Sequence, residues 1–146
     1  MTNLLLLAVF GISMAHLEGV VVVYLRKAFG MSDSESLKEF IGRFPPSYMN
    51  IEMTREAATI VMLLVIAFLT GTNWIEKIVF FLWTFAFWDL FYYLSLYILI
   101  KWPSKLTTTD VLFLIPVPWI APVWFPVSVS SLTIVVITVL YLLNIF

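Results

Sequence analysis

The 146-residue sequence contains no cysteine and few charged residues. Without cysteine it cannot form disulfides, thiolate metal sites or iron–sulfur clusters. Only 12% of the residues are charged, the net charge is −1, and no run of Lys or Arg offers a track for phosphate, so we expect no nucleic-acid partner. Glycine-rich phosphate loops and the motifs of hydrolases and zinc peptidases are also missing. The sequence therefore gives no sign of an enzyme.

Hydrophobic residues are abundant instead. They make up 62% of the chain, aromatic residues make up 17%, and the mean hydropathy is +1.04. A soluble domain of this length needs more polar surface than eight basic and nine acidic residues supply, whereas lipid accepts apolar side chains on the outside. The composition predicts an integral membrane protein. Membrane lipid is its expected partner, and we also expect bound lipid molecules.

Four segments are long and apolar enough to cross a bilayer, which takes about 20 helical residues. These predicted spans cover residues 4–25, 55–71, 74–101 and 127–146. Thr54 is the expected N-cap of the second span. The polar loop 26–54 contains an amphipathic stretch at 34–41, which we expect to form an interfacial helix on the membrane surface.

The segment 103–126 is rich in proline, with Pro116, Pro118, Pro122 and Pro126. Prolines at this density exclude one continuous helix. Irregular backbone at membrane depth is tolerated only when protein covers it or when it lines a cavity, so we expect a hairpin or a re-entrant segment before the fourth span. The predicted fold class is all-α integral membrane, with residues 1–146 forming one four-transmembrane-helix bundle.

The distribution of Lys and Arg predicts the orientation of the bundle. In a four-span arrangement only Lys77 falls on one side. The basic residues on the other side are Arg26, Lys27, Lys38, Arg43, Arg55, Lys101 and Lys105. Because cytoplasmic loops carry the excess of positive residues, both termini are expected to be extracytoplasmic.

Ionisable side chains inside apolar helices cost about 2.5–3.5 kcal/mol at a helix centre unless they are paired or protonated. The candidate site residues of this kind are His16, Glu18, Arg55, Glu56 and Asp89, with Glu52, Trp88, Tyr92, Tyr93 and Asp110 in support. His16 and Glu18 are two positions apart, so a helix points them roughly 200° away from each other. Tyr92 and Tyr93 follow Asp89 by three and four positions, so they can either hydrogen-bond its carboxylate or simply pack as aromatic side chains, and packing is the favoured interpretation.

These residues allow three interpretations. Arg55 can form a structural ion pair with Glu18 or Asp89 and fix the helix packing. Alternatively, desolvation can hold a proton on Glu18 or Asp89 until a substrate enters, which is proton coupling. A third possibility is an Fe or Mn site built from His16 or Glu18 together with Glu56 and Asp89. The single histidine and the absence of an ExxH pair weigh against the metal site.

Three segments resemble those of a family of small bacterial four-span membrane proteins: TREAATIVML, FWDLFYY and DVLFLIPVPWIAPVWFPV. This resemblance implies a bacterial or archaeal cytoplasmic membrane, and it implies no particular activity. Four spans with Glu18 in the first are also similar to the small multidrug resistance transporters, which would make Glu18 a proton and cation site in a dimer. The long first loop and the proline-rich segment depart from that pattern, so its mechanism is not carried over.

Three functions remain open on these grounds. The leading hypothesis is an accessory or assembly subunit of a larger membrane complex, whose partners are other membrane subunits or a second copy of the chain. In that case contacts should consume Glu18 and Asp89 and leave no pocket. A proton-coupled small transporter that uses the same two acids needs an aqueous route to them. A carboxylate and histidine metal protein needs at least three converging ligands.

Overall fold

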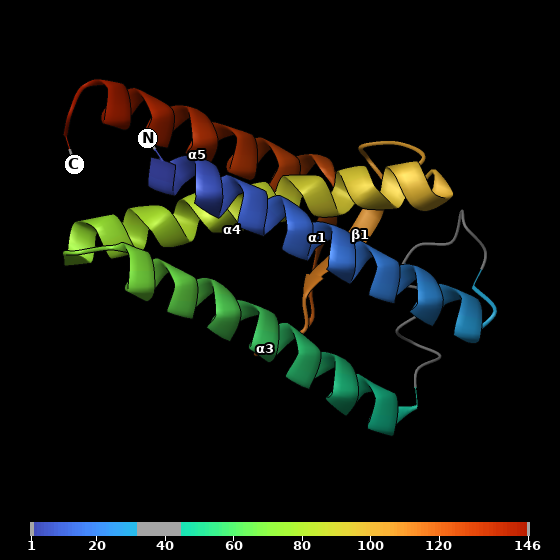
Figure 1. The fold of residues 1–146 in the computed structure, drawn as a ribbon. Helices are drawn as coiled ribbons and strands as arrows, with labels where there is room; N and C mark the ends of the chain where they lie inside the picture. The colour runs from blue at the N-terminus through green and yellow to red at the C-terminus, as the bar shows by residue number, and fades with distance from the viewer. Residues whose placement is uncertain (1, 32–44, 146) are drawn as a thin grey trace.

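The computed structural model describes residues 2–31 and 45–145, which form four long helices and one β-hairpin (Figure 1). The elements are α1 (Thr2–Ala28), α3 (Pro46–Thr70), α4 (Trp74–Ile100), β1 (Thr109–Phe113), β2 (Trp119–Pro122) and α5 (Trp124–Leu142). Each of the four helices is long and apolar enough to cross a membrane, so the prediction of four such helices is confirmed. The predicted amphipathic stretch 34–41 lies outside the described residues.

Helix α4 occupies the centre of the bundle and packs against α1, α3 and α5. Successive helices run in alternating directions, and the two termini lie at the same end of the bundle as the turn between α3 and α4 (Figure 1). The opposite end holds the C-terminus of α1 and the loop after α4. The chain therefore has the up-and-down topology of a four-helix bundle.

Small residues bring α1 and α4 close together. Gly11, Ala15 and Gly19 follow one another at intervals of four, and Ala15 is fully buried. A Cβ atom at Gly11 would lie 2.7 Å from the carbonyl oxygen of Thr84, and one at Gly19 would lie 3.1 Å from the Cβ of Ser95. Small residues at this spacing are typical of tight packing between membrane helices.

Two helices begin earlier than the sequence predicted. Helix α3 starts at Pro46 rather than after Thr54, and the Thr54 hydroxyl donates to the carbonyl of Ile51 within the helix. Proline is compatible with the first helical position because its missing N–H would have no intrahelical partner there. Helix α5 likewise begins at Trp124 and accommodates Pro126 in its first turn. In both cases the proline marks a helix start rather than an interruption.

The proline-rich segment contains an antiparallel β-hairpin, which adds a small sheet to the otherwise helical fold. Its register pairs Thr109 with Pro122 and Asp110 with Ala121, and a bulge follows Val111. Pro116 and Pro118 lie in the connection between the strands, where they cannot remove a ladder hydrogen bond. The hairpin places Asp110 beside α4, within hydrogen-bond distance of Tyr93.

Candidate functional site

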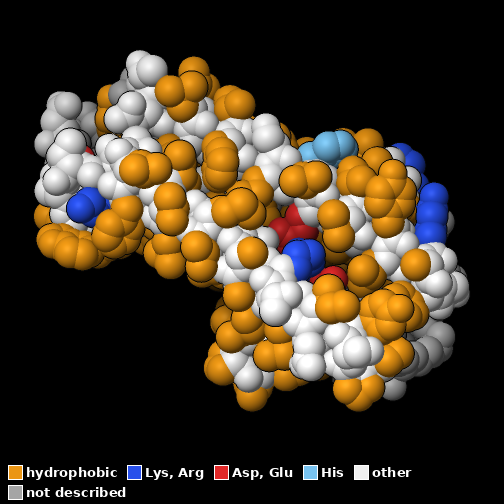
Figure 2. All heavy atoms as spheres, turned by 60° about the horizontal axis from the view of Figure 1, so that its bottom comes forward, with side chains coloured by type: hydrophobic (Ala, Val, Ile, Leu, Met, Phe, Trp, Pro, Cys, Tyr) orange, Lys and Arg blue, Asp and Glu red, His pale blue; other side chains and the backbone are white. Residues whose placement is uncertain are grey.

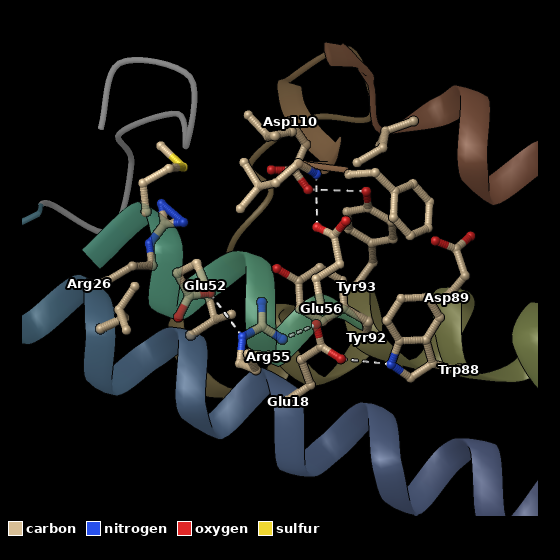
Figure 3. Close-up of a pocket in the computed structure, with 17 residues that line it drawn as sticks. Glu18, Arg26, Glu52, Arg55, Glu56, Trp88, Asp89, Tyr92, Tyr93 and Asp110 are labelled. Atoms are coloured by element: carbon tan, nitrogen blue, oxygen red, sulfur yellow. Dashed lines mark hydrogen bonds and ion pairs between the residues drawn. The ribbon is translucent and has the colours of Figure 1, made fainter. Parts of the chain in front are cut away.

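A cavity of about 80 Å³ lies between α1, α3, α4 and β1. Five carboxylates line it: Glu18, Glu52, Glu56, Asp89 and Asp110. The guanidinium groups of Arg26 and Arg55 also line it, together with aromatic side chains of α4 (Figure 3). Figure 2 shows acidic and basic side chains at the bottom of a hollow in a largely hydrophobic surface. The cavity is therefore a polar site within an apolar bundle.

Arg55 is the centre of an ion-pair network that joins α1 to α3 (Figure 3). Its Nη1 lies 2.5 Å from Oε1 of Glu18, and its Nε lies 2.8 Å from Oε2 of Glu52. The second oxygen of Glu18 accepts a hydrogen bond from the indole nitrogen of Trp88 at 2.9 Å. The expected ion pair of Arg55 is thus confirmed, and its partner is Glu18 rather than Asp89.

Asp89 and Asp110 each accept a hydrogen bond from a hydroxyl group, and the charge of Arg26 also acts on Asp110. The Ser130 hydroxyl of α5 donates to Asp89 at 2.7 Å, and the Tyr93 hydroxyl donates to Asp110 at 3.1 Å. The hydrogen bond that Tyr93 could form with Asp89 is not the one observed, because β1 brings a second carboxylate within reach of the phenol. Tyr92 lines the cavity beside Asp89.

Asp110 is the most enclosed of the five carboxylates, with 1% of its surface exposed. Burial raises its pKa to about 7, although hydrogen bonds from the Val111 backbone and Tyr93 act in the opposite direction. Its Oδ1 atom accepts no hydrogen bond from the residues that the structure describes. A buried carboxylate oxygen of this kind needs a proton, a water molecule or a bound cation.

Glu56 connects α3 to the hairpin. Its two carboxylate oxygens accept hydrogen bonds from the backbone N–H groups of Leu114, at 2.8 Å, and Ile115, at 3.0 Å. These N–H groups follow the end of β1 and would otherwise lack a partner in the ladder. Glu56 therefore fixes the hairpin over the cavity, a role that the sequence did not suggest.

The predicted metal site is not formed among the described residues, although Glu18, Glu56 and Asp89 line the same cavity. His16 lies on the exposed face of α1, away from the cavity, and is visible at the surface in Figure 2. Within residues 2–31 and 45–145, no three His, Asp or Glu side chains are grouped closely enough to hold a metal ion. The expected set of His16 or Glu18 with Glu56 and Asp89 does not form such a group.

Sequence reasoning missed two contributors to this region. Arg26 was assigned to the end of the first span, yet it is 2% exposed, lines the cavity and lies over the Trp102 ring at 4.9 Å. Helix α5 contains several hydroxyl residues. Only the packing of α5 on α4 shows that Ser130 is the one that contacts Asp89.

Comparisons with known proteins do not add a relative. No family model matches the chain, and no curated protein and no solved structure matches it. The function is therefore inferred from the geometry and charge of the cavity.

Proposed function

We propose that the four helices cross a membrane and that the cavity is the binding site of a small proton-coupled carrier for a monovalent cation. One observation carries this proposal. Among the residues that the structure describes, five carboxylates and two guanidinium groups line a single cavity, which gives a formal charge of −3 when all are ionised. In a low-dielectric interior such an excess of negative charge is unfavourable, so protons or a cation must balance it.

The contacts divide the acids into two groups. Glu18 and Glu52 share Arg55, and Glu56 is engaged by the hairpin backbone, so these three hold the walls of the cavity together. Asp89 and Asp110 receive only hydroxyl and backbone hydrogen bonds. We therefore assign proton and cation exchange to Asp89 and Asp110, and a structural role to Glu18.

The coupling follows from this arrangement. Without substrate, protons on Asp89 and Asp110 reduce the negative charge of the cavity. A monovalent cation that enters near these carboxylates favours their ionised form and displaces a proton. A volume of about 80 Å³ also accommodates several water molecules, each of which requires about 10–15 Å³ by this measure, so water can conduct the released proton.

Transport by the purified protein in liposomes tests the proposal. A trapped pH-sensitive dye would report proton movement when sodium, potassium or tetramethylammonium is added outside. We expect proton efflux driven by at least one of these cations, and we expect Asp89→Asn and Asp110→Asn to abolish it. Glu76→Gln is the matched control, because Glu76 is an exposed carboxylate that contacts Thr72 at the start of α4 and is not part of the cavity. Cation-independent leakage, or equal flux in the two Asp variants, would refute the carrier.

A second candidate function is the accessory or assembly subunit, and the outer surface of the bundle supports it. Only 22% of the apolar window of α3 and 17% of that of α5 is buried within the chain. These faces are available to lipid or to another membrane subunit. Purification in mild detergent tests this candidate: polypeptides that copurify in fixed proportion, combined with no transport by the isolated chain, would favour a subunit over a carrier.

A further inference from the structure

Helix α1 has a second regular face, opposite the one that packs on α4. Its first five residues alternate at spacings of three and four, which is the heptad pattern of helices that pair along a seam, and the sixth follows after four more positions. We call this face the α1 seam, and it consists of Leu6, Val9, Ser13, His16, Val20 and Tyr24. Of these, Leu6 is 61% exposed, Val9 is 53% exposed and Tyr24 is 69% exposed. The cavity is complete without this face.

The middle of the α1 seam is polar. His16 lies close to the midpoint of a 27-residue helix and is exposed, and no hydrogen bond or ion pair joins it to the other described residues. Ser13 satisfies its own hydroxyl by donating to the carbonyl of Val9 at 2.8 Å. In the proposed four-span arrangement, His16 would then face hydrocarbon at mid-depth, where a polar group without a partner is costly.

We infer that the α1 seam binds the α1 seam of a second copy of this chain, with the two His16 side chains meeting across the symmetry axis. A neutral imidazole carries its donor and its acceptor on opposite sides of the ring, so one His16 can donate an N–H···N hydrogen bond to the other across the axis, in either direction. The seam contains no Asp, Glu, Lys or Arg, so no repulsion between such charges opposes the pairing. Histidine is one of the side chains that hydrogen-bond between membrane helices.

The basic residues determine that the two helices are parallel. Since the Lys and Arg bias gives every copy the same orientation, both α1 helices point in the same direction, and identical seam positions face each other. This step rests on the proposed membrane insertion and is independent of transport through the cavity. It therefore predicts contact between Ser13 and Ser13 of the second copy, and likewise at positions 9, 16 and 20.

Cysteine cross-linking in native membranes tests the inference, and the absence of cysteine from the chain gives a clean background. Val9→Cys, Ser13→Cys and Val20→Cys should form disulfide-linked dimers under mild oxidation. Leu5→Cys and Leu17→Cys are the controls, because both are 65% exposed on α1 and lie beside the seam. Cross-linking restricted to the seam supports the dimer, whereas cross-linking at none of its positions, or equally at the controls, overturns it.

Substitution of His16 tests the central contact. Interhelical hydrogen bonds in membranes contribute about 0.6–2 kcal/mol, so His16→Ala should weaken dimer formation about 3–30-fold. His16→Gln retains a donor and an acceptor and should restore much of the affinity. Energy transfer between labelled copies in liposomes measures the dissociation constant. An unchanged constant in His16→Ala would remove His16 from the interface, even if the carrier proposal held.

Discussion

Arg55 determines how two of the cavity acids can coexist. Its Nε and Nη1 atoms contact two different carboxylates, Glu52 and Glu18, which come from different helices. A guanidinium group can do this because its donors are fixed in a planar fork, whereas a lysine ammonium is a point charge on a flexible chain. Trp88 then orients Glu18 from the other side. The side chain of Arg55 thus positions α3 against α1 at the level of the cavity.

Asp110 provides a prediction about pH. Its pKa is about 7 in the folded protein and about 3.9 in an unfolded chain, so the folded state retains a proton that the unfolded state has lost between these values. The stability that Asp110 contributes is complete below pH 4, decreases as the pH rises towards 7, and changes little above that. We expect this decrease to be on the order of a few kcal/mol.

The measurement is thermal unfolding in detergent at pH 5 and pH 8. Wild-type protein should lose stability between these pH values, and Asp110→Asn should lose clearly less, because an amide does not titrate. Glu76→Gln, which removes an exposed carboxylate at the start of α4, should retain the wild-type decrease. A wild-type decrease that persists in Asp110→Asn would assign the pH dependence to another group.

At the scale of the helices, α1 has two opposite faces that differ in their residues and their contacts. Its small residues Gly11, Ala15 and Gly19 lie on the buried face, whereas Leu6, Val9 and Tyr24 face outward. The sequence predicted the existence of the helices from length and hydropathy. It did not predict which helices touch, because apolar residues cover every side of a membrane helix and give little direction. The spacing of the small residues was the available signal for α1 and α4.

Substitution at Gly11 tests the close approach of α1 and α4. The Cβ of Gly11→Ala would lie 2.7 Å from the backbone carbonyl oxygen of Thr84, which cannot move without shifting α4. We expect a loss of about 1–3 kcal/mol, the usual cost of overpacking, despite the higher helix propensity of alanine. Thermal unfolding in detergent measures it. Gly19→Ala should be milder, because its Cβ meets a side-chain atom at 3.1 Å; equal effects at both positions would contradict this account.

At the scale of the whole molecule, the sequence predicted some of the site residues. It did not predict which residues come together around the cavity. Apolar surroundings identified Glu18, Glu56 and Asp89, because charges in such segments need a partner. The partners themselves depend on tertiary packing: Asp110 comes from a hairpin, Ser130 from the last helix, and Arg26 from a helix end. No local pattern places such distant residues around one cavity.

The positions of the chain ends test the proposed four-span arrangement. Both termini and the turn between α3 and α4 lie at one end of the bundle (Figure 1). Arg26 and Lys27 at the end of α1, and Lys101 and Lys105 after α4, belong to the segments at the other end. If the basic end is cytoplasmic, an impermeant maleimide added to intact cells should label Thr2→Cys, Asn73→Cys and Asn144→Cys. It should label Ser104→Cys only after the membrane is permeabilised.

Each alternative gives its own labelling pattern, because the four positions report separate connections of the bundle. If intact cells label Ser104→Cys and none of the other three positions, the protein has the opposite orientation with the same four spans. Labelling of Thr2→Cys but not Asn144→Cys would show that the proline-rich segment crosses the membrane as an additional pass. Labelling of all four positions in intact cells would show that α4 does not cross the membrane, and would remove the low-dielectric surroundings of the cavity on which the proposed coupling of protons to a cation depends.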